Sequence, residues 1–548
     1  MMNGAPASPM PTGPITGGAC RPFCRAPTLF SLENDLEREA NANLYTVLRS
    51  GFPSDLGAVA IETPGRTYSW ADIDAISGRM AALLRSFGAP AGSRVAVQVE
   101  KSPEALMLYL ATLRAGLVYL PLNTAYREAE VAYFLGDAEP SVVVCADSAK
   151  SWCEPLARGK GAAQVLTLNA DGSGSLADAA AAMELAFETA HSAPGDLAAI
   201  LYTSGTTGRS KGAMLTHANL ASNALTLRDF WGWRADDVLL HMLPIFHVHG
   251  LFVASHGALL AGARMIWLPK LDVEQALHYL PRCTLMMGVP TYYVRLLADP
   301  RFGRETCSNM RLFISGSAPL LVDTFREFQA RSGMTILERY GMSETGMITS
   351  NPWDPARGER IPGTVGPALP GQFVRVMDDA GQPVAIGEPG HVQVRGPNVF
   401  AGYWRMPEKT REEFTADGWF RTGDIGVLGG PGIPDDYLSI VGRSKDLIIS
   451  GGYNVYPKEI EMVIDAMPGV QESAVIGVPH ADFGEAVVAV VVPRAGASVD
   501  PVAIQAGLKS GLANFKVPKK IHVIDALPRN AMGKVQKNVL RQQYADLE

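Results

Sequence analysis

The sequence predicts an α/β fold, with layered β-sheets flanked by helices in a large N-terminal domain and a smaller α+β domain at the C-terminus. Strand-like and helix-like segments alternate from about residue 60 onward, as in layered α/β proteins. The chain has 548 residues, which exceeds the size at which a single hydrophobic core stops growing. At least two domains are therefore expected.

The first segment, residues 1–27, is expected to be a disordered tail. It is rich in Pro, Gly and Ala, has no acidic residue and lacks the apolar central part of a secretory signal. A weak organelle-targeting segment is the alternative. The N-terminal domain then spans residues 28–442, and no apolar run in the sequence reaches the length of a membrane span.

Within this domain, apolar runs predict the strands and capping residues predict the helices. Ser102, Pro103 and Glu104 are typical of the cap, first turn and dipole-matched acid of a helix that ends near Gly116. A second helix is expected to begin at Pro290. Strands are expected at residues 94–100, 142–145, 197–201, 285–288 and 312–315.

A change of composition separates the two domains. Residues 429–436 are rich in Gly and Pro and predict a loop. The boundary is placed in a hinge at residues 443–446, and the C-terminal domain spans residues 447–548. This domain is expected to contain strands at residues 473–478, 485–492 and 520–524 and a helix at residues 501–512.

The bulk composition excludes several partners. The net charge is −7 and no Lys/Arg-rich block occurs, so neither nucleic acid nor an anionic membrane surface is an expected partner. The six cysteines are scattered, which indicates a reduced, cytoplasmic protein. The histidines at positions 241, 247, 249 and 256 have no cysteine or carboxylate at ligand spacing, so a zinc site is not expected.

Residues 202–214, YTSGTTGRSKGAM, carry the first chemical signature. A strand that runs into a loop of Gly, Ser and Thr exposes backbone N–H groups that suit an anion. The residue before Lys211 is Ser210, where the P-loop of nucleotide triphosphatases requires glycine, so that fold is disfavoured. On composition alone, a plain connecting loop is the alternative.

Segments further along the chain make the signature specific. They are residues 338–345 (ERYGMSET), 419–424 (WFRTGD), 442–446 (GRSKD) and 528–534 (PRNAMGK). In this order, the segments resemble the acyl-adenylate-forming superfamily of acyl-CoA synthetases, luciferases and adenylation domains of peptide synthetases. The resemblance covers nearly everything from about residue 40 to the end. It implies the adenylate-forming fold, in which the small C-terminal domain is mobile.

The resemblance also implies a reaction in two steps. A carboxylate attacks the α-phosphate of ATP and releases pyrophosphate, and the acyl adenylate then acylates the thiol of coenzyme A. Two anions meet in the first step, so the site must neutralise charge and hold the reacting groups in line. ATP and coenzyme A are the expected co-substrates, and Mg²⁺ is the expected cofactor.

Most of the nucleotide site is assigned by this resemblance. Glu344 and Thr206 are expected to bind Mg²⁺, and Asp424, assisted by Arg443, is expected to accept the ribose hydroxyls. Tyr340 is expected to flank the adenine. The expected ATP- and AMP-binding residues are Thr203, Ser204, Gly205, Thr206, Thr207, Gly208, Lys211, Gly316, Ser317, Ala318, Glu338, Tyr340, Gly341, Met342, Ser343, Asp424 and Arg443.

Residues in the C-terminal part of the chain are expected to act one after another in the two steps. Lys534 resembles the mobile lysine that meets the α-phosphate and the attacking carboxylate, and Lys445 occupies the hinge position. Rotation at the hinge would bring Gly451 and Gly452 to the coenzyme A tunnel, where glycine permits close backbone approach. His247 resembles the histidine that lines the acyl pocket beside the reacting carboxylate.

Malonate, or its methyl derivative, is the predicted acid. Arg295 lies on the helix expected from Pro290, where enzymes for fatty or aryl acids would want an apolar or small residue. Its planar guanidinium matches a second carboxylate, and His249 is expected to help hold it. With residues 122–126 and 338–339, this segment resembles the malonyl-CoA synthetase branch.

Three alternatives stay open. The nearest is a coenzyme A ligase for a monocarboxylic acid, either short- or medium-chain or aryl. The second is a stand-alone adenylation enzyme that loads a carrier protein. The third is a nucleotide-binding regulator without catalysis, which the presence of Glu344, Asp424, Arg443 and Lys534 disfavours.

Overall fold

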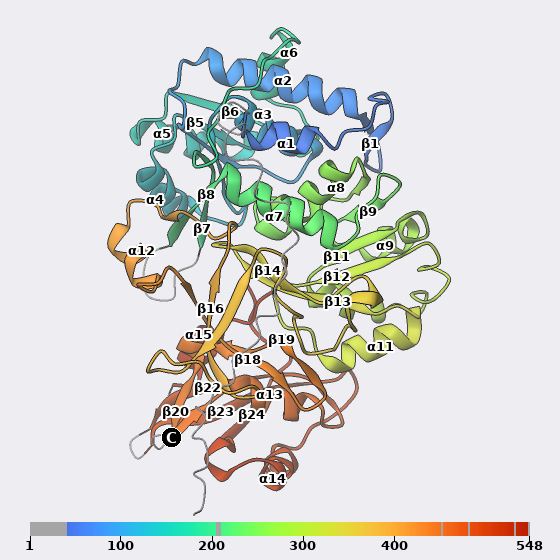
Figure 1. Cartoon of the computed structure of the whole chain (residues 1–548), viewed down its shortest axis with the longest axis vertical. Helices are drawn as coiled ribbons and strands as arrows, with labels where there is room; N and C mark the ends of the chain where they lie inside the picture. Colours follow the sequence, from blue (N-terminus) through green and yellow to red (C-terminus); the bar gives the residue numbers. More distant parts are fainter. Residues whose placement is uncertain (1–40, 204–209, 451–452, 481–482, 531–532, 546–548) are drawn as a thin grey trace, which may run out of the picture. The chain divides into compact units, whose positions relative to one another are not determined.

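The computed structural model describes residues 41–203, 210–450, 453–480, 483–530 and 533–545 (Figure 1). The predicted tail, residues 1–27, lies outside them. Backbone contacts divide the chain into two units, Met1–Asn41 and Ala42–Glu548, and the architecture below is that of the second. Across the described ranges, no helix is both long and apolar enough to cross a membrane.

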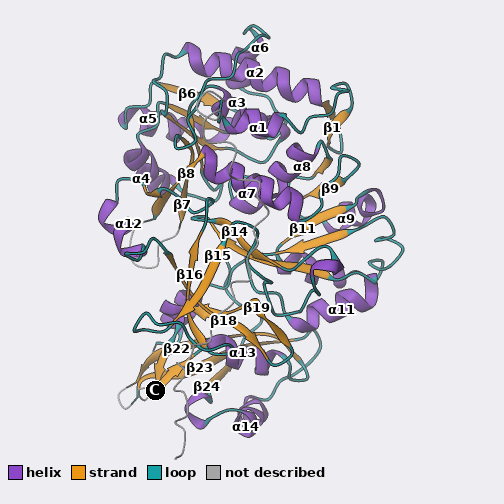
Figure 2. Ribbon diagram, in the orientation of Figure 1, coloured by secondary structure: helices purple, strands orange, loops and turns teal. Residues whose placement is uncertain are grey.

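Two large mixed sheets form the body of the N-terminal region (Figure 1, Figure 2). The first has seven strands, in the order β17 (Gly402–Tyr403), β8 (Lys211–Thr216), β7 (Leu197–Thr203), β4 (Val118–Pro121), β3 (Arg94–Gln98), β5 (Val142–Cys145) and β6 (Gln164–Thr167). The second has eight, in the order β14 (Gly346–Ser350), β13 (Ile336–Met342), β12 (Leu312–Ser315), β11 (Leu285–Gly288), β9 (Val238–His241), β10 (Arg264–Trp267), β1 (Val59–Glu62) and β2 (Thr67–Ser69).

Strand alternation sends neighbouring side chains to different cores. Val95 of β3 and Leu239 of β9 belong to one buried cluster, whereas the next residues, Ala96 and Leu240, belong to two others. The shared cluster therefore lies between the two sheets. Its helices are α1 (Leu44–Arg49), α2 (Trp70–Ser86), α3 (Pro103–Arg114), α6 (Ser175–Ala181), α7 (His217–Phe230), the π-helix η2 (His249–Ser255) and α8 (His256–Ala261).

Other helices cover the outer faces of the two sheets. Residues of α4 (Glu128–Ala138) and α5 (Lys150–Gly159) share a cluster with the seven-stranded sheet. Residues of α9 (Val273–Tyr279), α10 (Pro290–Leu297) and α11 (Val322–Ser332) share one with the eight-stranded sheet. The layers are thus helix, sheet, helix, sheet and helix.

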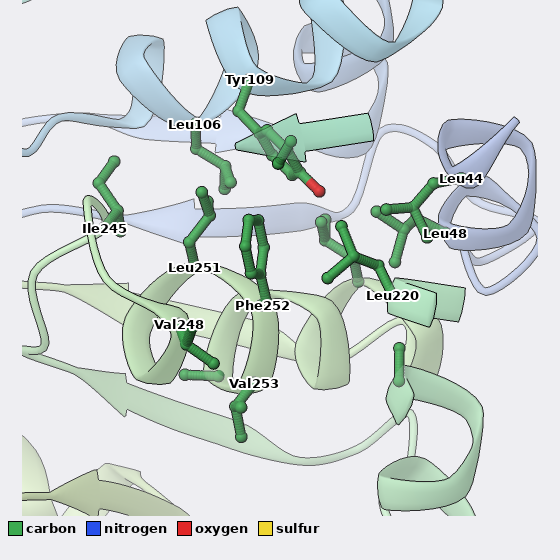
Figure 3. Close-up of a cluster of buried hydrophobic side chains, with 14 of the residues drawn as sticks. Leu44, Leu48, Leu106, Tyr109, Leu220, Ile245, Val248, Leu251, Phe252 and Val253 are labelled. Carbon is green, nitrogen blue, oxygen red and sulfur yellow. The ribbon is translucent and has the colours of Figure 1, made fainter. Parts of the chain in front are cut away.

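Figure 3 shows part of the layer between the sheets. Leu251 and Phe252 of η2 point toward Leu106 and Tyr109 of α3, while Val253 points to the other side of η2. The ring centroids of Tyr109 and Phe252 are 5.8 Å apart. This packing holds η2, whose first residue is His249, against the core.

Two smaller sheets complete the chain. One has the order β15 (Phe373–Met377), β16 (Pro389–Arg395), β18 (Phe420–Gly430) and β19 (Ile433–Arg443). The other contains β21 (Tyr453–Val455), β20 (Ile448–Ser450), β23 (Gly484–Pro493), β22 (Val470–His480) and β24 (Lys520–Val523), with helices α13 (Pro457–Asp465), α14 (Pro501–Gly511) and α15 (Lys537–Gln543).

The chain passes from the four-stranded sheet to the last sheet through a single 3₁₀ turn, Ser444–Asp446. This turn lies within residues 443–446, where the sequence predicts the domain boundary, and the division into two domains there stays a prediction. The C-terminal sheet also has hydrophobic clusters of its own. Rotation about the turn stays a prediction.

Most predicted elements of the N-terminal region are confirmed, but the predicted loop at residues 429–436 is wrong. There β18 and β19 continue as a hairpin in which Gly430 pairs with Ile433. The turn consists of Pro431 and Gly432, and Gly432 has φ of 75°, which only glycine adopts at little cost. The glycines and prolines that predicted a loop therefore form one tight turn and the register shift between Leu428 and Gly430.

The Ser102 cap of α3 gives a stability prediction. Its side chain accepts a hydrogen bond of 3.1 Å from the backbone N–H of Ala105, as the sequence predicted. We expect Ser102→Ala to destabilise the protein by about 1 kcal/mol, because an N–H of the first turn loses its acceptor. Scanning calorimetry should show a lower transition temperature for Ser102→Ala and a nearly normal one for Ser102→Thr. An unchanged Ser102→Ala transition would contradict the capping role.

Candidate active site

Three residues predicted to bind the nucleoside lie together at the junction of two sheets. Asp424 on β18 and Arg443 on β19 are cross-strand partners, with 2.8 Å between Arg443 Nε and Asp424 Oδ1. Tyr340, on β13 of the eight-stranded sheet, donates a hydrogen bond of 2.5 Å to Asp424 Oδ2. Each carboxylate oxygen keeps a lone pair for a further donor, so this buried carboxylate can still accept from a pair of hydroxyls.

Glu344 lies in the turn between β13 and β14 and is buried. Tyr403 donates a hydrogen bond of 3.0 Å to Glu344 Oε1. Burial raises the pKa of Glu344, and the bond from Tyr403 together with the charges of Arg443 and Lys211 opposes that rise. A buried carboxylate with one side-chain donor on one oxygen has the oxygen chemistry that Mg²⁺ prefers.

Lys211 lies beside this acid. Its Nζ is 4.5 Å from the ring centre of Tyr403 and 3.3 Å from Oε1 of Glu413, on α12 (Pro407–Glu413). Neither Tyr403 nor Glu413 was predicted from the sequence. No sequence motif marks Tyr403 as a site residue. Glu413 comes from a helix about 200 residues after Lys211 in the sequence.

The centre of the predicted phosphate loop, which comprises Ser204, Gly205, Thr206, Thr207 and Gly208, lies outside the described residues, as do Gly451 and Gly452 of the predicted coenzyme A tunnel. The two ends of the phosphate loop are described. Thr203 and Lys211 pair across β7 and β8, and Tyr133 donates a hydrogen bond of 2.8 Å to the carbonyl of Ser210. The backbone therefore holds the loop closed at its base.

Lys534 reaches the same region from the C-terminal domain. A Cβ added to the adjacent Gly533 would lie 3.5 Å from Oγ1 of Thr291 on α10, so this turn lies against the predicted acyl helix. Burial lowers the pKa of Lys534 and Arg443 lowers it further, whereas Asp424 and Glu344 oppose both effects. The lysine thus lies within electrostatic reach of the acids at which the sequence expects the nucleotide.

Arg339, on β13, is the unusual residue of the site. Its side chain is 3% exposed, and neither Nε nor Nη2 has a hydrogen-bond partner in the part of the chain that the structure describes. A Cβ added to Gly316 would lie only 2.4 Å from Cζ of Arg339, so the guanidinium lies flat against that glycine. Burial lowers the pKa of Arg339 to about 9, which leaves it a cation at neutral pH. A buried cation without a counter-ion is costly unless a ligand supplies one.

The charge of this cation acts on two predicted histidines. Burial, followed by the charges of Lys534 and Arg339, lowers the pKa of His247 to about 3. Burial, followed by the charge of Arg339, also lowers the pKa of His249, so both rings are neutral at pH 7. His249 Nδ1 is 3.3 Å from Oγ of Ser317, and its Nε2 has no partner among the described residues.

Arg295 differs from this buried group in its exposure. It is exposed on α10, whereas Arg339 and His249 are buried. An exposed guanidinium is hydrated and binds a carboxylate weakly, and the role expected for Arg295 stays a prediction. In the sequence, Arg339 was one of the residues, 338–339, that resemble the malonyl-CoA synthetase branch, and nothing there indicated that its side chain is buried.

The other predicted residues lie at the following positions. Glu338 is buried and accepts a hydrogen bond of 3.2 Å from the N–H of Gly363, and burial raises its pKa to about 8. Lys445 is exposed in the connecting 3₁₀ turn. Gly316, Ser317 and Ala318 follow β12, Gly341 and Met342 end β13, and Ser343 begins the turn that carries Glu344.

Comparisons with known proteins agree with this arrangement. Residues 52–404 match the model of the AMP-binding enzyme family, and residues 459–534 match the model of the AMP-binding enzyme C-terminal domain. A mitochondrial malonate–CoA ligase of Mus musculus is 37% identical over 79% of this chain and 79% of its own. An indoleacetate–CoA ligase of Aromatoleum aromaticum is 35% identical over 89% of this chain and 96% of its own.

Solved structures extend the likeness. The crystal structure of ATP-bound MatB from Rhodopseudomonas palustris has a TM-score of 0.89 and 57% identity, and covers 93% of this chain and 100% of its own. The apo structure of the same protein has a TM-score of 0.80 over the same shares of the two chains.

The Tyr403–Glu344 hydrogen bond gives a pH prediction. The bond favours the ionised carboxylate, so its removal in Tyr403→Phe should raise the pKa of Glu344 further. Because the protonated acid cannot bind a cation, the acid limb of ATP–pyrophosphate exchange should move to higher pH. A pH profile at saturating ATP checks this. An acid limb that stays in place, or moves to lower pH, would show that Glu344 does not control it.

Proposed function

The chain belongs to the family of AMP-binding enzymes, and we propose that it is an ATP-dependent ligase that joins malonate to coenzyme A. The observation that carries the choice of acid is the buried guanidinium of Arg339, whose Nε and Nη2 have no partner among the described residues and whose charge lowers the pKa of the neutral His249. A malonate ion has two carboxylates, so one can react while the other supplies the missing counter-ion. The malonate–CoA ligase of Mus musculus and the likeness to MatB support the same assignment.

The reaction proceeds in two balanced steps. An oxygen of one malonate carboxylate attacks the α-phosphorus of ATP, the bond to the β-phosphate oxygen breaks, and pyrophosphate leaves. The sulfur of coenzyme A then attacks the carbonyl carbon of the malonyl adenylate, so that the thioester forms and AMP leaves. The thiol proton leaves to solvent or to a basic group, and no oxidant or reductant is needed.

Each charged residue has one task in the first step. We assign the ribose hydroxyls to Asp424, which Tyr340 and Arg443 already orient. Lys534, as an ammonium, approaches the α-phosphate and the attacking carboxylate and reduces the repulsion between the two anions. His247, held neutral by burial, lines the space beside the reacting carboxylate.

Mg²⁺ is the proposed cofactor, with Glu344 as its protein ligand; the second predicted ligand, Thr206, lies outside the described residues. When bound, the ion supplies positive charge that stabilises the leaving pyrophosphate. Tyr403 orients the carboxylate for that purpose through its hydrogen bond to Oε1.

The charge at Arg339 also weighs against the monocarboxylate alternative. A fatty or aryl acid would bury apolar surface against the guanidinium and leave its donors unpaired, which rejects such acids strongly. Methylmalonate keeps both carboxylates and stays a candidate. A carrier protein as acyl acceptor stays the second alternative, and the rate with free coenzyme A separates it from the first.

We keep the prediction of a cytoplasmic location. Four buried cysteines, Cys145, Cys153, Cys283 and Cys307, are free thiols. Free thiols fit a reducing compartment.

A substitution of Arg339 tests the choice of acid. We expect Arg339→Met to lower kcat/KM for malonate by at least about a hundredfold, since a bidentate ion pair in a buried site is lost. The KM for ATP should change little. Arg295→Ala is the control, because its side chain is exposed on the neighbouring helix and should keep nearly full activity. A large loss of activity in Arg295→Ala, with little loss in Arg339→Met, would instead show that Arg295 binds the second carboxylate.

Lys534 gives a separate prediction for the first step. Lys534→Ala should lower the rate of malonate-dependent ATP–pyrophosphate exchange by about a hundredfold or more, because a transition-state charge loses its partner. The matched control is Lys537→Ala. Lys537 lies three residues away and pairs with Glu461 at 2.6 Å. Equal losses in the two variants would mean that Lys534 acts only through stability.

A further inference from the structure

The ammonium group of Lys101 is buried at the carboxyl ends of two neighbouring strands. Lys101 follows β3 of the seven-stranded sheet and immediately precedes the Ser102 cap of α3. Its Nζ donates to the carbonyls of His241, at 2.8 Å, and Leu268, at 2.7 Å, which lie at the ends of β9 and β10. Nζ also lies 4.4 Å from the ring centre of Trp267. Lys101 thus links the two large sheets at the edge where parallel sheets bind ligands.

The third contact of this ammonium fixes the state of a histidine. Lys101 Nζ is 2.9 Å from His241 Nδ1. His241 Nε2 is 3.0 Å from the carbonyl oxygen of Gly250, which can only accept, so the ring proton of the neutral His241 is on Nε2 and Nδ1 accepts from Lys101. His241 is 1% exposed, and burial followed by the charge of Lys101 lowers its pKa, which keeps the ring neutral.

The Nε2–H of His241 points at the start of the π-helix. His241 Nε2 is 3.0 Å from the carbonyl oxygen of Gly250 and 3.1 Å from Oγ of Ser255, and that hydroxyl also donates to the Gly250 carbonyl at 2.9 Å. A Cβ on Gly250 would lie 2.1 Å from the carbonyl oxygen of Pro244, so the preceding loop folds tightly over this residue. The residue before Gly250 is His249, whose Nδ1 is 3.3 Å from Oγ of Ser317 and whose pKa is lowered by burial and by the charge of Arg339.

We infer that Lys101 and His241 are positioning residues for the acid-binding pocket. Lys101 holds His241 as the Nε2–H tautomer, His241 holds the carbonyl of Gly250, and this carbonyl sets where η2 presents His249 to the carboxylate paired with Arg339. The inference rests on the proposed function, because it assigns a role in binding the same second carboxylate. It adds residues that touch neither malonate nor ATP. Lys101 follows β3 of the seven-stranded sheet, and His241 ends β9, which is in the same sheet as β13, the strand of Arg339.

A pair of substitutions at His241 separates the two hydrogen bonds. The amide of glutamine can replace the Nε2–H of histidine as the donor to Gly250, whereas the amide of asparagine replaces only the Nδ1 side. We expect His241→Gln to keep a malonate KM close to that of the wild type. His241→Asn and Lys101→Met should each raise the malonate KM by about tenfold, with the KM for ATP within about twofold of normal.

The control is His256→Gln, another fully buried histidine, which is hydrogen-bonded to Tyr109 at 2.9 Å and is not linked to Gly250. It should lower thermal stability without a selective change in malonate KM. Equal malonate KM values for His241→Gln and His241→Asn, or equal increases in the KM for malonate and ATP, would overturn the inference. If Lys101→Met does not fold, the two His241 variants alone decide. Failure of the wild type to form malonyl-CoA would instead refute the proposed function.

Discussion

The site is organised around one buried positive charge. The guanidinium of Arg339 lies in the interior of the protein, flat against Gly316, with two of its nitrogens unpaired among the described residues. Removing such a cation from water costs several kcal/mol unless a counter-ion replaces the water. The surroundings respond to this charge, because it contributes to keeping His247 and His249 neutral and lowers the pKa of Lys534. In the proposed function, the second carboxylate of the acid restores the balance of charge.

The fold supplies the rigidity that such a charge requires. Arg339 lies on β13 of the eight-stranded sheet, and Tyr340, the next residue, bonds to Asp424 of the four-stranded sheet. Successive side chains of one strand point to opposite sides, so the proposed function places the acid at Arg339 and the nucleoside at Tyr340. Glu344 follows in the turn that ends this strand. In the proposed function, a single strand and its turn would thus carry the groups for the acid, the ribose and the metal.

The structure brings the predicted nucleotide residues together, and their assigned roles stay predictions. Asp424, Arg443, Tyr340, Glu344 and Lys534 come from short segments whose order along the chain is itself specific, and the structure brings these residues within reach of one another. No comparable sequence pattern indicated the contacts between distant parts of the chain.

The residues that the sequence missed depend on burial. Periodicity on the predicted helix could not tell whether Arg295 or a strand arginine would be buried, and nothing local linked Lys101 to His241, which lies 140 residues away. The Gly/Pro-rich segment at residues 429–436 failed for a different reason, since composition does not distinguish a loop from the tight turn of a long hairpin.

The most direct test of this account is a crystal structure with a non-hydrolysable analogue of malonyl adenylate. The account predicts that the free carboxylate of the malonyl group binds Nε and Nη2 of Arg339 and lies within hydrogen-bond distance of His249 Nε2, with Arg295 still in solvent. A free carboxylate that points to solvent or to Arg295, with Arg339 still unpaired, would contradict it.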